Sequence, residues 1–280
     1  MSDPLVSTAW LAERLGAADV QVIDATWFMP GDPRTGREGF MAAHIPGAVF
    51  FDIDGIADHA TDLPHMLPSP QAFAAAAGAL GLRRDATVVV YDGQGIFSAP
   101  RVWWTLRTMG FAKVRVLDGG LPKWRAEGRA VQSDGVAPAP SVLDAVFEPA
   151  LVADLTSVRD LLERRAARVI DARPGPRYRA EVPEPRAGLR GGHMPGACNV
   201  PFGGLIETDG TMKSAAELRA AFEAAGVDLS APIVTTCGSG ISAAVLALAL
   251  ARLGREDVAV YDGSWTEWGG RSDTPVATGA

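Results

Sequence analysis

The sequence predicts an α/β protein built from two tandem domains, each a mainly parallel sheet flanked by helices. Short, nearly all-apolar runs alternate with helix-forming stretches, as expected for sheets that are covered on both faces. The chain also repeats itself once, and a segment rich in Pro, Ala and Ser separates the two copies. We therefore predict a first domain over 1–130, an extended linker over 131–154 and a second domain over 155–280.

Four pairs of similar segments define the repeat, in the same order in both copies. They are 20–28 with 167–175, 42–52 with 191–201, 86–102 with 231–247, and 114–124 with 258–268. An offset this long indicates a duplicated domain, since solenoid repeats are far shorter. Some side chains occur in both copies and are expected to build the scaffold or pack in it. They are Asp24 and Asp171, His44 and His193, and Trp124 with Trp265 and Trp268.

Strand and helix signals alternate within each copy. "TVVVYD" at 87–92 and "PIVTTC" at 232–237 are short apolar runs typical of buried strands. "SPQAFAAAAGALGL" at 69–82 begins with a Ser-Pro cap signal. "SAAELRAAFEAAGV" at 214–227 begins with Ser214 and has Glu217 three residues later, which predicts a capping box and a helix start.

Composition excludes several classes of protein. The net charge is -7 and Lys and Arg are scattered, which argues against nucleic acid or an anionic membrane as a partner. The longest apolar run is much shorter than a bilayer span, and the N-terminus shows no secretory signal. Two cysteines are too few for a disulfide framework or a cysteine zinc site. We expect a cytoplasmic protein with no metal and no organic cofactor.

Cys237 lies where a predicted buried strand ends and a helix begins. Open parallel sheets bind ligands at the carboxyl ends of their strands. The following "GSGIS" contains two glycines, and the amides of such a turn, with the helix N-terminus, favour a negative charge. The position therefore favours the nucleophilic thiolate. In the first copy the same position is Asp92.

Other interpretations of this region fit less well. Cys198 has no glycine turn after it and is expected to be structural. A phosphatase of the Cys-x5-Arg kind needs Arg six positions after the cysteine, and that position is Ala243. "GQGIFS" in the first copy lacks the third glycine of a dinucleotide loop, and the chain has no Gly-Lys-Ser/Thr phosphate loop.

Four segments together carry a resemblance to a known family. "GHMPGACNVPF", "TTCGSGISAA", "YDGSWTEWG" and the duplicated "HIPGAVFFDID" resemble the rhodanese superfamily in its two-domain form, over essentially the whole chain. The resemblance implies two rhodanese-like domains, a non-catalytic N-terminal one and a catalytic C-terminal one. Asp92 at the nucleophile position of the first copy is consistent with that division.

The loop from Cys237 to Gly240 is similar to that of the 3-mercaptopyruvate sulfurtransferases, whereas thiosulfate sulfurtransferases typically carry Cys-Arg-Lys-Gly. Thiosulfate is a dianion that cationic loop side chains would favour, whereas the carboxylate of a mercaptopyruvate needs donors elsewhere. The substrate-binding residues that the resemblance implies are Arg177, Arg186, Gly238, Gly240, Ile241 and Ser242. Arg179 and Arg173 in the same stretch remain alternatives to the arginine pair, as does a simple solvated basic loop.

The resemblance also implies a catalytic group beside Cys237, made of Ser239, His65 and Asp54. Hydrogen bonds from Asp to His to Ser would orient the hydroxyl next to the transferred sulfur. His59 is an alternative by its place in the sequence, and His65 could instead cap a turn.

The implied activity is a sulfur transfer in two steps. Cys237 takes sulfur from 3-mercaptopyruvate, releases pyruvate and becomes a persulfide. Cyanide, a small thiol or a thioredoxin-like dithiol then accepts the outer sulfur. The alternatives are a thiosulfate:cyanide sulfurtransferase and a non-catalytic persulfide carrier.

Overall fold

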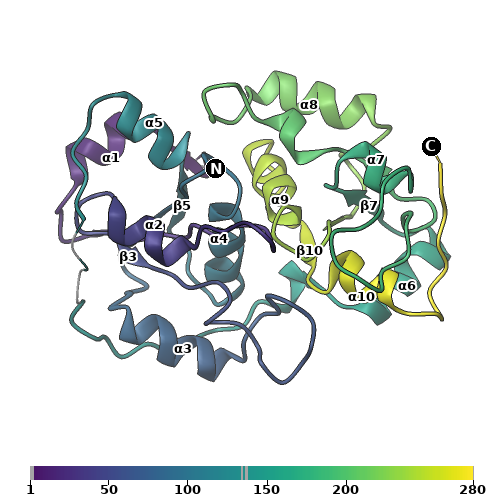
Figure 1. Cartoon of the computed structure of the whole chain (residues 1–280), viewed down its shortest axis with the longest axis horizontal. Helices are drawn as coiled ribbons and strands as arrows, with labels where there is room; N and C mark the ends of the chain where they lie inside the picture. Colours follow the sequence, from purple (N-terminus) through teal and green to yellow (C-terminus); the bar gives the residue numbers. More distant parts are fainter. Residues whose placement is uncertain (1–2, 134, 136–137, 280) are drawn as a thin grey trace. The chain divides into compact units, whose positions relative to one another are not determined.

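The chain folds into two compact units in the computed structural model, which describes residues 3–133, 135 and 138–279 (Figure 1). Unit 1 comprises Met1–His59, Leu67–Glu148 and Glu207–Met212. Unit 2 comprises Ala60–Met66, Pro149–Ile206 and Lys213–Ala280. Two short segments, 60–66 and 207–212, thus belong to the unit formed mainly by the other half of the chain.

Unit 1 contains a five-stranded parallel sheet of order β1-β5-β4-β2-β3. The strands are β1 (Leu5–Val6), β2 (Val20–Asp24), β3 (Val49–Phe50), β4 (Thr87–Tyr91) and β5 (Val114–Leu117). The helices are α1 (Thr8–Arg14), α2 (Gly36–Ala42), α3 (Pro70–Ala79), α4 (Ala99–Thr108) and α5 (Gly120–Ala126). Strand β4 is central, and its last four residues are buried, as its apolar run predicts.

Unit 2 repeats this arrangement, with a parallel sheet of order β6-β10-β9-β7-β8. The strands are β6 (Val152–Ala153), β7 (Arg168–Asp171), β8 (Cys198–Asn199), β9 (Ile233–Thr236) and β10 (Ala259–Tyr261). The α-helices are α6 (Leu155–Arg164), α7 (Gly175–Tyr178), α8 (Ala215–Ala224), α9 (Ala243–Arg252) and α10 (Ser264–Gly270); η1 (Pro149–Leu151) and η2 (Phe202–Leu205) are 3-10 turns. Equal strand order in both units confirms the duplicated α/β fold.

The predicted helix starts are also confirmed. The Ser69 side chain accepts a hydrogen bond from the amide of Ala72 at the start of α3. At the start of α8, the Ser214 side chain and the Glu217 side chain each bond the other residue's backbone amide, which is the predicted capping box. Each cap satisfies helix amides that have no partner within the helix.

At both ends of 131–154, the structure contains backbone pairing where the sequence predicts an extended linker. Gln132 pairs with His44 by two backbone hydrogen bonds of 2.8 Å. Residues 149–153 form η1 and β6, so the end of the segment supplies the edge strand of the second sheet. The sequence signal was weak because an edge strand of two residues is too short to show a period. Within this segment, 134, 136 and 137 lie outside the described residues.

The duplicated histidines have the same surroundings in both units. The Nδ1 atom of His44 lies 2.8 Å from the carbonyl oxygen of Phe40, and that of His193 lies 2.9 Å from the carbonyl oxygen of Tyr178. Each imidazole stacks on the ring of the same residue and is buried. This shared geometry supports a scaffold role for both.

Asp24 and Asp171 are equivalent in the repeat but have different partners. Asp171 pairs with the guanidinium of Arg173 at 2.6 Å, and both side chains are almost fully buried. The residue of unit 1 that corresponds to Arg173 is Thr26, whose amide and hydroxyl donate to Asp24 at 2.8 and 2.5 Å. Burial raises the pKa of Asp24 to about 6, and these hydrogen bonds only partly oppose it.

We therefore expect Asp24→Asn to stabilise the protein at neutral pH. Since the pKa of Asp24 is higher in the folded than in the unfolded chain, the folded state binds its proton more tightly, and stability decreases as pH rises from about 4 to about 6. Above that range the penalty is constant, at about 3 kcal/mol. Asn keeps the acceptor for Thr26 and removes the penalty. Urea unfolding at pH 4 and pH 7.5 measures the effect.

Asp171→Asn is the matched control for this prediction. It removes the counter-charge of a buried arginine and should destabilise the protein by about 3 kcal/mol or more at pH 7.5. If Asp24→Asn destabilised the protein equally, the burial penalty assigned to Asp24 would be wrong.

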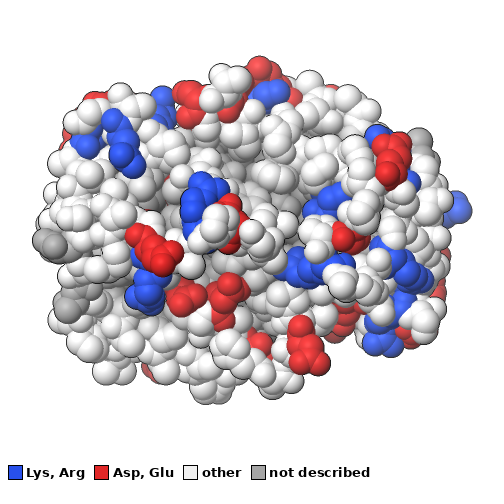
Figure 2. Space-filling view, viewed as in Figure 1, with Lys and Arg blue, Asp and Glu red and all other residues white. Residues whose placement is uncertain are grey.

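Two further observations concern the surface. None of the helices in the described part of the chain is long and apolar enough to cross a membrane. Figure 2 shows Lys and Arg interspersed with Asp and Glu on one face, without a large patch of either sign. This mixture of charges agrees with the scattered Lys and Arg residues of the sequence.

Candidate active site

Cys237 begins the loop that joins strand β9 to helix α9. Its side chain is only 2% exposed, and the amide of Gly240 donates to its Sγ atom at 3.2 Å. Gly240 has a φ of +84°, a conformation that favours glycine, so the loop turns at this residue. The loop thus already directs one backbone donor at the cysteine sulfur.

The start of helix α10 holds this loop in place. The amide of Trp265 donates to the carbonyl of Cys237 at 3.0 Å, and the amide and hydroxyl of Thr266 donate to the carbonyl of Gly238 at 2.8 and 2.7 Å. The Ser264 hydroxyl accepts from the amide of Cys237 at 3.2 Å. These bonds fix the backbone on both sides of the sulfur.

The equivalent loop of unit 1 surrounds the carboxyl group of Asp92 with backbone amides. One carboxylate oxygen of Asp92 accepts hydrogen bonds from the amides of Phe97, Ser98 and Ala99 at 2.8 to 2.9 Å, and the other accepts from Gln94 at 2.8 Å. Asp92 is fully buried. The turn that follows the central strand is therefore able to hold an anion.

We expect Asp92→Ala to destabilise unit 1 by about 3 kcal/mol, since it leaves four backbone donors without their acceptor. Chemical unfolding at neutral pH measures this. The matched control is Cys237→Ala, which loses one N–H···S contact and should cost about 1 kcal/mol. Equal costs for the two variants would contradict the anion-holding role of the unit 1 turn.

Arg177 lies directly against the Cys237 loop. A Cβ atom added to Gly238 would lie 3.0 Å from Nη2 of Arg177, so a larger residue there would press against the guanidinium. Arg177 follows strand β7 on the short helix α7, and its side chain is 17% exposed. A cation is thus held beside the residue that follows the cysteine.

The two alternative arginines have other partners. Arg173 is buried, and its donors bond Asp171, Glu184 and the carbonyl of Gly192. Arg179 is paired with Glu181 on the surface. The geometry therefore favours Arg177 over both.

Arg186 and His65 lie close together in unit 2. The Nη2 atom of Arg186 is 3.4 Å from Nε2 of His65, which belongs to the segment 60–66. His65 is buried and has a φ of +62°, an uncommon conformation for a residue with a side chain. His59 is exposed, and its nearest hydrogen-bond partner is the carbonyl of Gly55 at 3.4 Å.

The remaining predicted residues are divided between the units. Ser239 is buried in the loop two residues after Cys237, and Ile241 and Ser242 complete the loop before α9. Asp54 belongs to unit 1, where it accepts a hydrogen bond from the indole of Trp27 at 2.8 Å. The group of Ser239, His65 and Asp54 stays a prediction.

Cys198 lies on the edge strand β8 and is partly buried. Burial raises the pKa of its thiol, which favours the neutral form. This agrees with the structural role expected from its sequence context.

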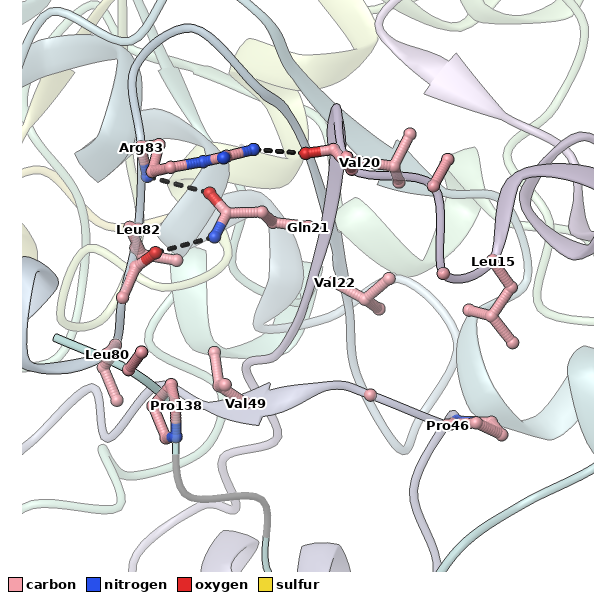
Figure 3. A pocket seen from close by; sticks show the side chains of 16 residues that line it. Leu15, Val20, Gln21, Val22, Pro46, Val49, Leu80, Leu82, Arg83 and Pro138 are labelled. Atoms are coloured by element: carbon pink, nitrogen blue, oxygen red, sulfur yellow. Dashed lines mark hydrogen bonds between the residues drawn. The ribbon is translucent and has the colours of Figure 1, made fainter. Parts of the chain in front are cut away.

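A large cavity of unit 1 has a different character (Figure 3). It measures about 750 Å³ and lies at the amino ends of β2 and β3, lined by Leu15, Val20, Val22, Val49, Leu80 and Leu82 among others. The Gln21 amide donates to the carbonyl of Gly81 and accepts from the amide of Arg83. None of the described residues that line it is Cys, His, Asp or Glu. Among its described lining residues, this cavity thus offers no thiol, imidazole or carboxyl group for catalysis.

Comparison with known families assigns the chain to one of them. The model of the rhodanese-like domain matches residues 7–127 and again residues 154–271. The chain belongs to the rhodanese-like family. The two matches correspond to the two copies of the repeat, so the family resemblance found in the sequence is confirmed.

Individual family members are similar over nearly their whole length. The 3-mercaptopyruvate sulfurtransferase of Escherichia coli K12 is 46% identical over 97% of this chain and 96% of its own. The thiosulfate sulfurtransferase of Bos taurus is 44% identical over 94% of this chain and 91% of its own. The crystal structure of SseA from Escherichia coli, a 3-mercaptopyruvate sulfotransferase, has a TM-score of 0.87, 43% identity, and covers 94% of this chain and 99% of that one.

Sequence reasoning missed one residue of this site. Glu184 bonds both Arg173 and Arg177 with a side chain that is 1% exposed. Its only sequence signal is its place among five arginines in 173–190, where guanidinium groups that fold inward would need a counter-charge.

Proposed function

We propose that this chain is a sulfurtransferase that takes sulfur from 3-mercaptopyruvate, carries it on Cys237 as a persulfide and passes it to a thiol or cyanide. The observation that carries the proposal is the guanidinium of Arg177 beside Gly238, next to a buried cysteine whose sulfur already accepts a loop amide. The name of the Escherichia coli relative supports the same donor.

The first step forms a sulfur–sulfur bond and breaks a carbon–sulfur bond. The Cys237 thiolate attacks the sulfur of 3-mercaptopyruvate, and the electron pair of the carbon–sulfur bond passes to the pyruvate enolate. The thiol proton of the substrate ends on the enolate carbon, which gives pyruvate and an anionic persulfide. In the second step, cyanide or a thiolate takes the outer sulfur and restores the Cys237 thiolate.

The loop amides would stabilise the negative charge of the persulfide. Unit 1 provides the comparison, because its carboxylate at the same position is held by the amides of Phe97, Ser98 and Ala99. The corresponding residues of unit 2 are Ser242, Ala243 and Ala244. Backbone donors that are already oriented need no reorganisation when the charge forms.

Recognition of the donor would rest on its carboxylate. Arg177 and Arg186 supply the charge that the loop itself lacks, since no Arg or Lys follows Cys237 before Arg252. A guanidinium fork suits a carboxylate with an adjacent carbonyl. Ser239 and His65 would orient and exchange the proton, and Asp54 stays a predicted partner of His65.

Thiosulfate is the second candidate donor, favoured by the 44% identity to the Bos taurus thiosulfate sulfurtransferase. Identities of 46% and 44% do not separate the two donors, whereas the uncharged loop favours mercaptopyruvate. Steady-state comparison of both donors with cyanide as acceptor decides. A higher kcat/KM with thiosulfate would overturn the proposed donor.

The proposed roles of the units follow from Asp92. Unit 1 has no sulfur at that position and would be non-catalytic, whereas unit 2 would carry the chemistry. Both cysteines are free, which fits a reducing compartment such as the cytoplasm, where a thioredoxin-like dithiol could serve as acceptor.

Mass analysis after mixing the protein with 3-mercaptopyruvate alone tests the first step directly. The proposal requires a gain of one sulfur atom on Cys237 together with an equal amount of pyruvate. A non-catalytic carrier would gain no sulfur from this donor. Neither product would appear if the proposal were wrong.

A further inference from the structure

The structure assigns to Glu184 the role of a positioning residue, which orients Arg177 so that one edge of its guanidinium is presented to the carboxylate of the sulfur donor. This inference rests on the proposed function. It concerns a residue that makes no direct contact with the reacting sulfur.

The first step of the argument is the contact between Glu184 and Arg177. The Nε atom of Arg177 donates to one oxygen of Glu184 at 3.2 Å, and its Nη2 atom donates to the other oxygen. This side-on pairing uses the Nε–Nη2 edge of the guanidinium. The second edge, formed by Nη1 and Nη2, retains the donors that a second carboxylate would need.

The second step is the position of that second edge. The guanidinium atoms nearest to a Cβ built on Gly238 are Nη2 at 3.0 Å, then Cζ and Nη1 at 3.9 Å each. The edge left by Glu184 therefore lies at the loop that carries Cys237. A donor bound there by its carboxylate would have its sulfur near the cysteine.

The third step is the rigidity of Glu184 itself. Its side chain is 1% exposed, and one of its oxygens also accepts from Nη1 of Arg173 at 2.9 Å. Arg173 is held by Asp171 and lies 4.3 Å from the centre of the Trp265 ring. Because the backbone of Trp265 bonds Cys237, the arginine network and the cysteine loop share one support.

The charges in this network balance. Arg173 and Arg177 carry two positive charges, and Asp171 and Glu184 carry two negative ones. A substrate carboxylate thus meets a guanidinium whose charge is partly compensated, so binding depends on hydrogen-bond geometry more than on net charge. Removing the charge of Glu184 would leave the cation in place but free to rotate.

The test uses Glu184→Gln, with Glu184→Asp as the conservative variant. In Gln, an NH2 group replaces one acceptor and opposes the guanidinium donors. We expect KM for 3-mercaptopyruvate to rise about tenfold, the effect of losing one charge-assisted contact, while kcat changes by less than about threefold. Glu184→Asp keeps the charge and should recover most of the affinity.

The matched control is Glu181→Gln. Glu181 makes the same kind of pair with Arg179, but on the surface, with side chains that are 52% and 37% exposed. The substitution is identical and lies three residues away. Both kinetic constants should stay unchanged.

Two further measurements separate positioning from a merely structural role. In the Arg177→Ala background, Glu184→Gln should add no further rise in KM, because Glu184 acts through Arg177. In the Cys237→Ser background, which holds the donor without turnover, Glu184→Gln should weaken binding of 3-mercaptopyruvate about tenfold by calorimetry. If Arg177→Ala and Glu184→Gln raised KM additively, or if Glu184→Gln left binding of 3-mercaptopyruvate unchanged, the inference would be overturned. A lower melting temperature of the variant would not change that conclusion.

A failure of the proposed function would give different results in these experiments. In that case the unmodified protein would release no pyruvate from 3-mercaptopyruvate and the Cys237→Ser variant would not bind it. If both succeed and Glu184→Gln has no effect on KM or binding, only the role of Glu184 is wrong.

Discussion

Cys237→Ser is expected to lower kcat/KM for 3-mercaptopyruvate by more than about a thousandfold. A hydroxyl is a far weaker nucleophile than a thiolate near neutral pH, and oxygen at this position has no route to a persulfide. The change is small in volume, and the Gly240 amide can still donate to the serine oxygen, so the fold should be retained. Pyruvate formation in the presence of cyanide measures the loss.

Cys198→Ser is the control for this substitution. Cys198 is the second cysteine of the chain, is partly buried, and has a thiol that burial keeps in the neutral form. We expect activity within about twofold of the unmodified protein, since the substitution leaves the loop unchanged. Continued pyruvate release by Cys237→Ser, or its loss only in Cys198→Ser, would contradict the assigned nucleophile.

Arg177→Ala is expected to raise KM for 3-mercaptopyruvate about a hundredfold, with a smaller effect on kcat. The loss corresponds to about 2.7 kcal/mol, within the range for a paired guanidinium–carboxylate contact that excludes water. The reason is that the guanidinium lies at Gly238, and removing it leaves the substrate carboxylate without a counter-charge at the loop. Steady-state kinetics over a wide donor range gives both constants.

Arg179→Ala is the matched control, since Arg179 lies two residues away and pairs with Glu181 on the surface. Its KM should stay within about twofold, because exposed ion pairs contribute little. If Arg179→Ala raised KM as much as Arg177→Ala, the proposed binding site for the substrate carboxylate would have to include the exposed Arg179.

The fold was predictable because its signals are local and doubled. The apolar strand at 87–92, the Ser69 and Ser214 helix caps and the repeat each point to the same architecture. Cys237 was predictable as well, since a strand followed by a glycine turn and a helix places it at the carboxyl end of the sheet.

What escaped prediction depends on contacts between residues that are distant in the chain. The edge strand at 152–153 exists because β10 pairs with it, and its two residues show no pattern of their own. The place of 60–66 in unit 2, which brings His65 to Arg186, follows from tertiary packing. Glu184 was missed because a shared counter-charge is visible only once Arg173 and Arg177 are seen to converge on it.

The buried carboxylate of Asp92 gives the duplication a chemical meaning. Unit 1 carries the oxygen acceptors for the amides of its turn as a permanent part of the chain, whereas under the proposed function the turn of unit 2 holds a sulfur anion, first as the Cys237 thiolate and then as the persulfide. Under that proposal, the Asp92 carboxyl group takes in unit 1 the place that the persulfide takes in unit 2 during turnover. The turn that begins with Asp92 is thus filled by its own side chain, whereas the turn that begins with Cys237 would keep that place for the sulfur it transfers.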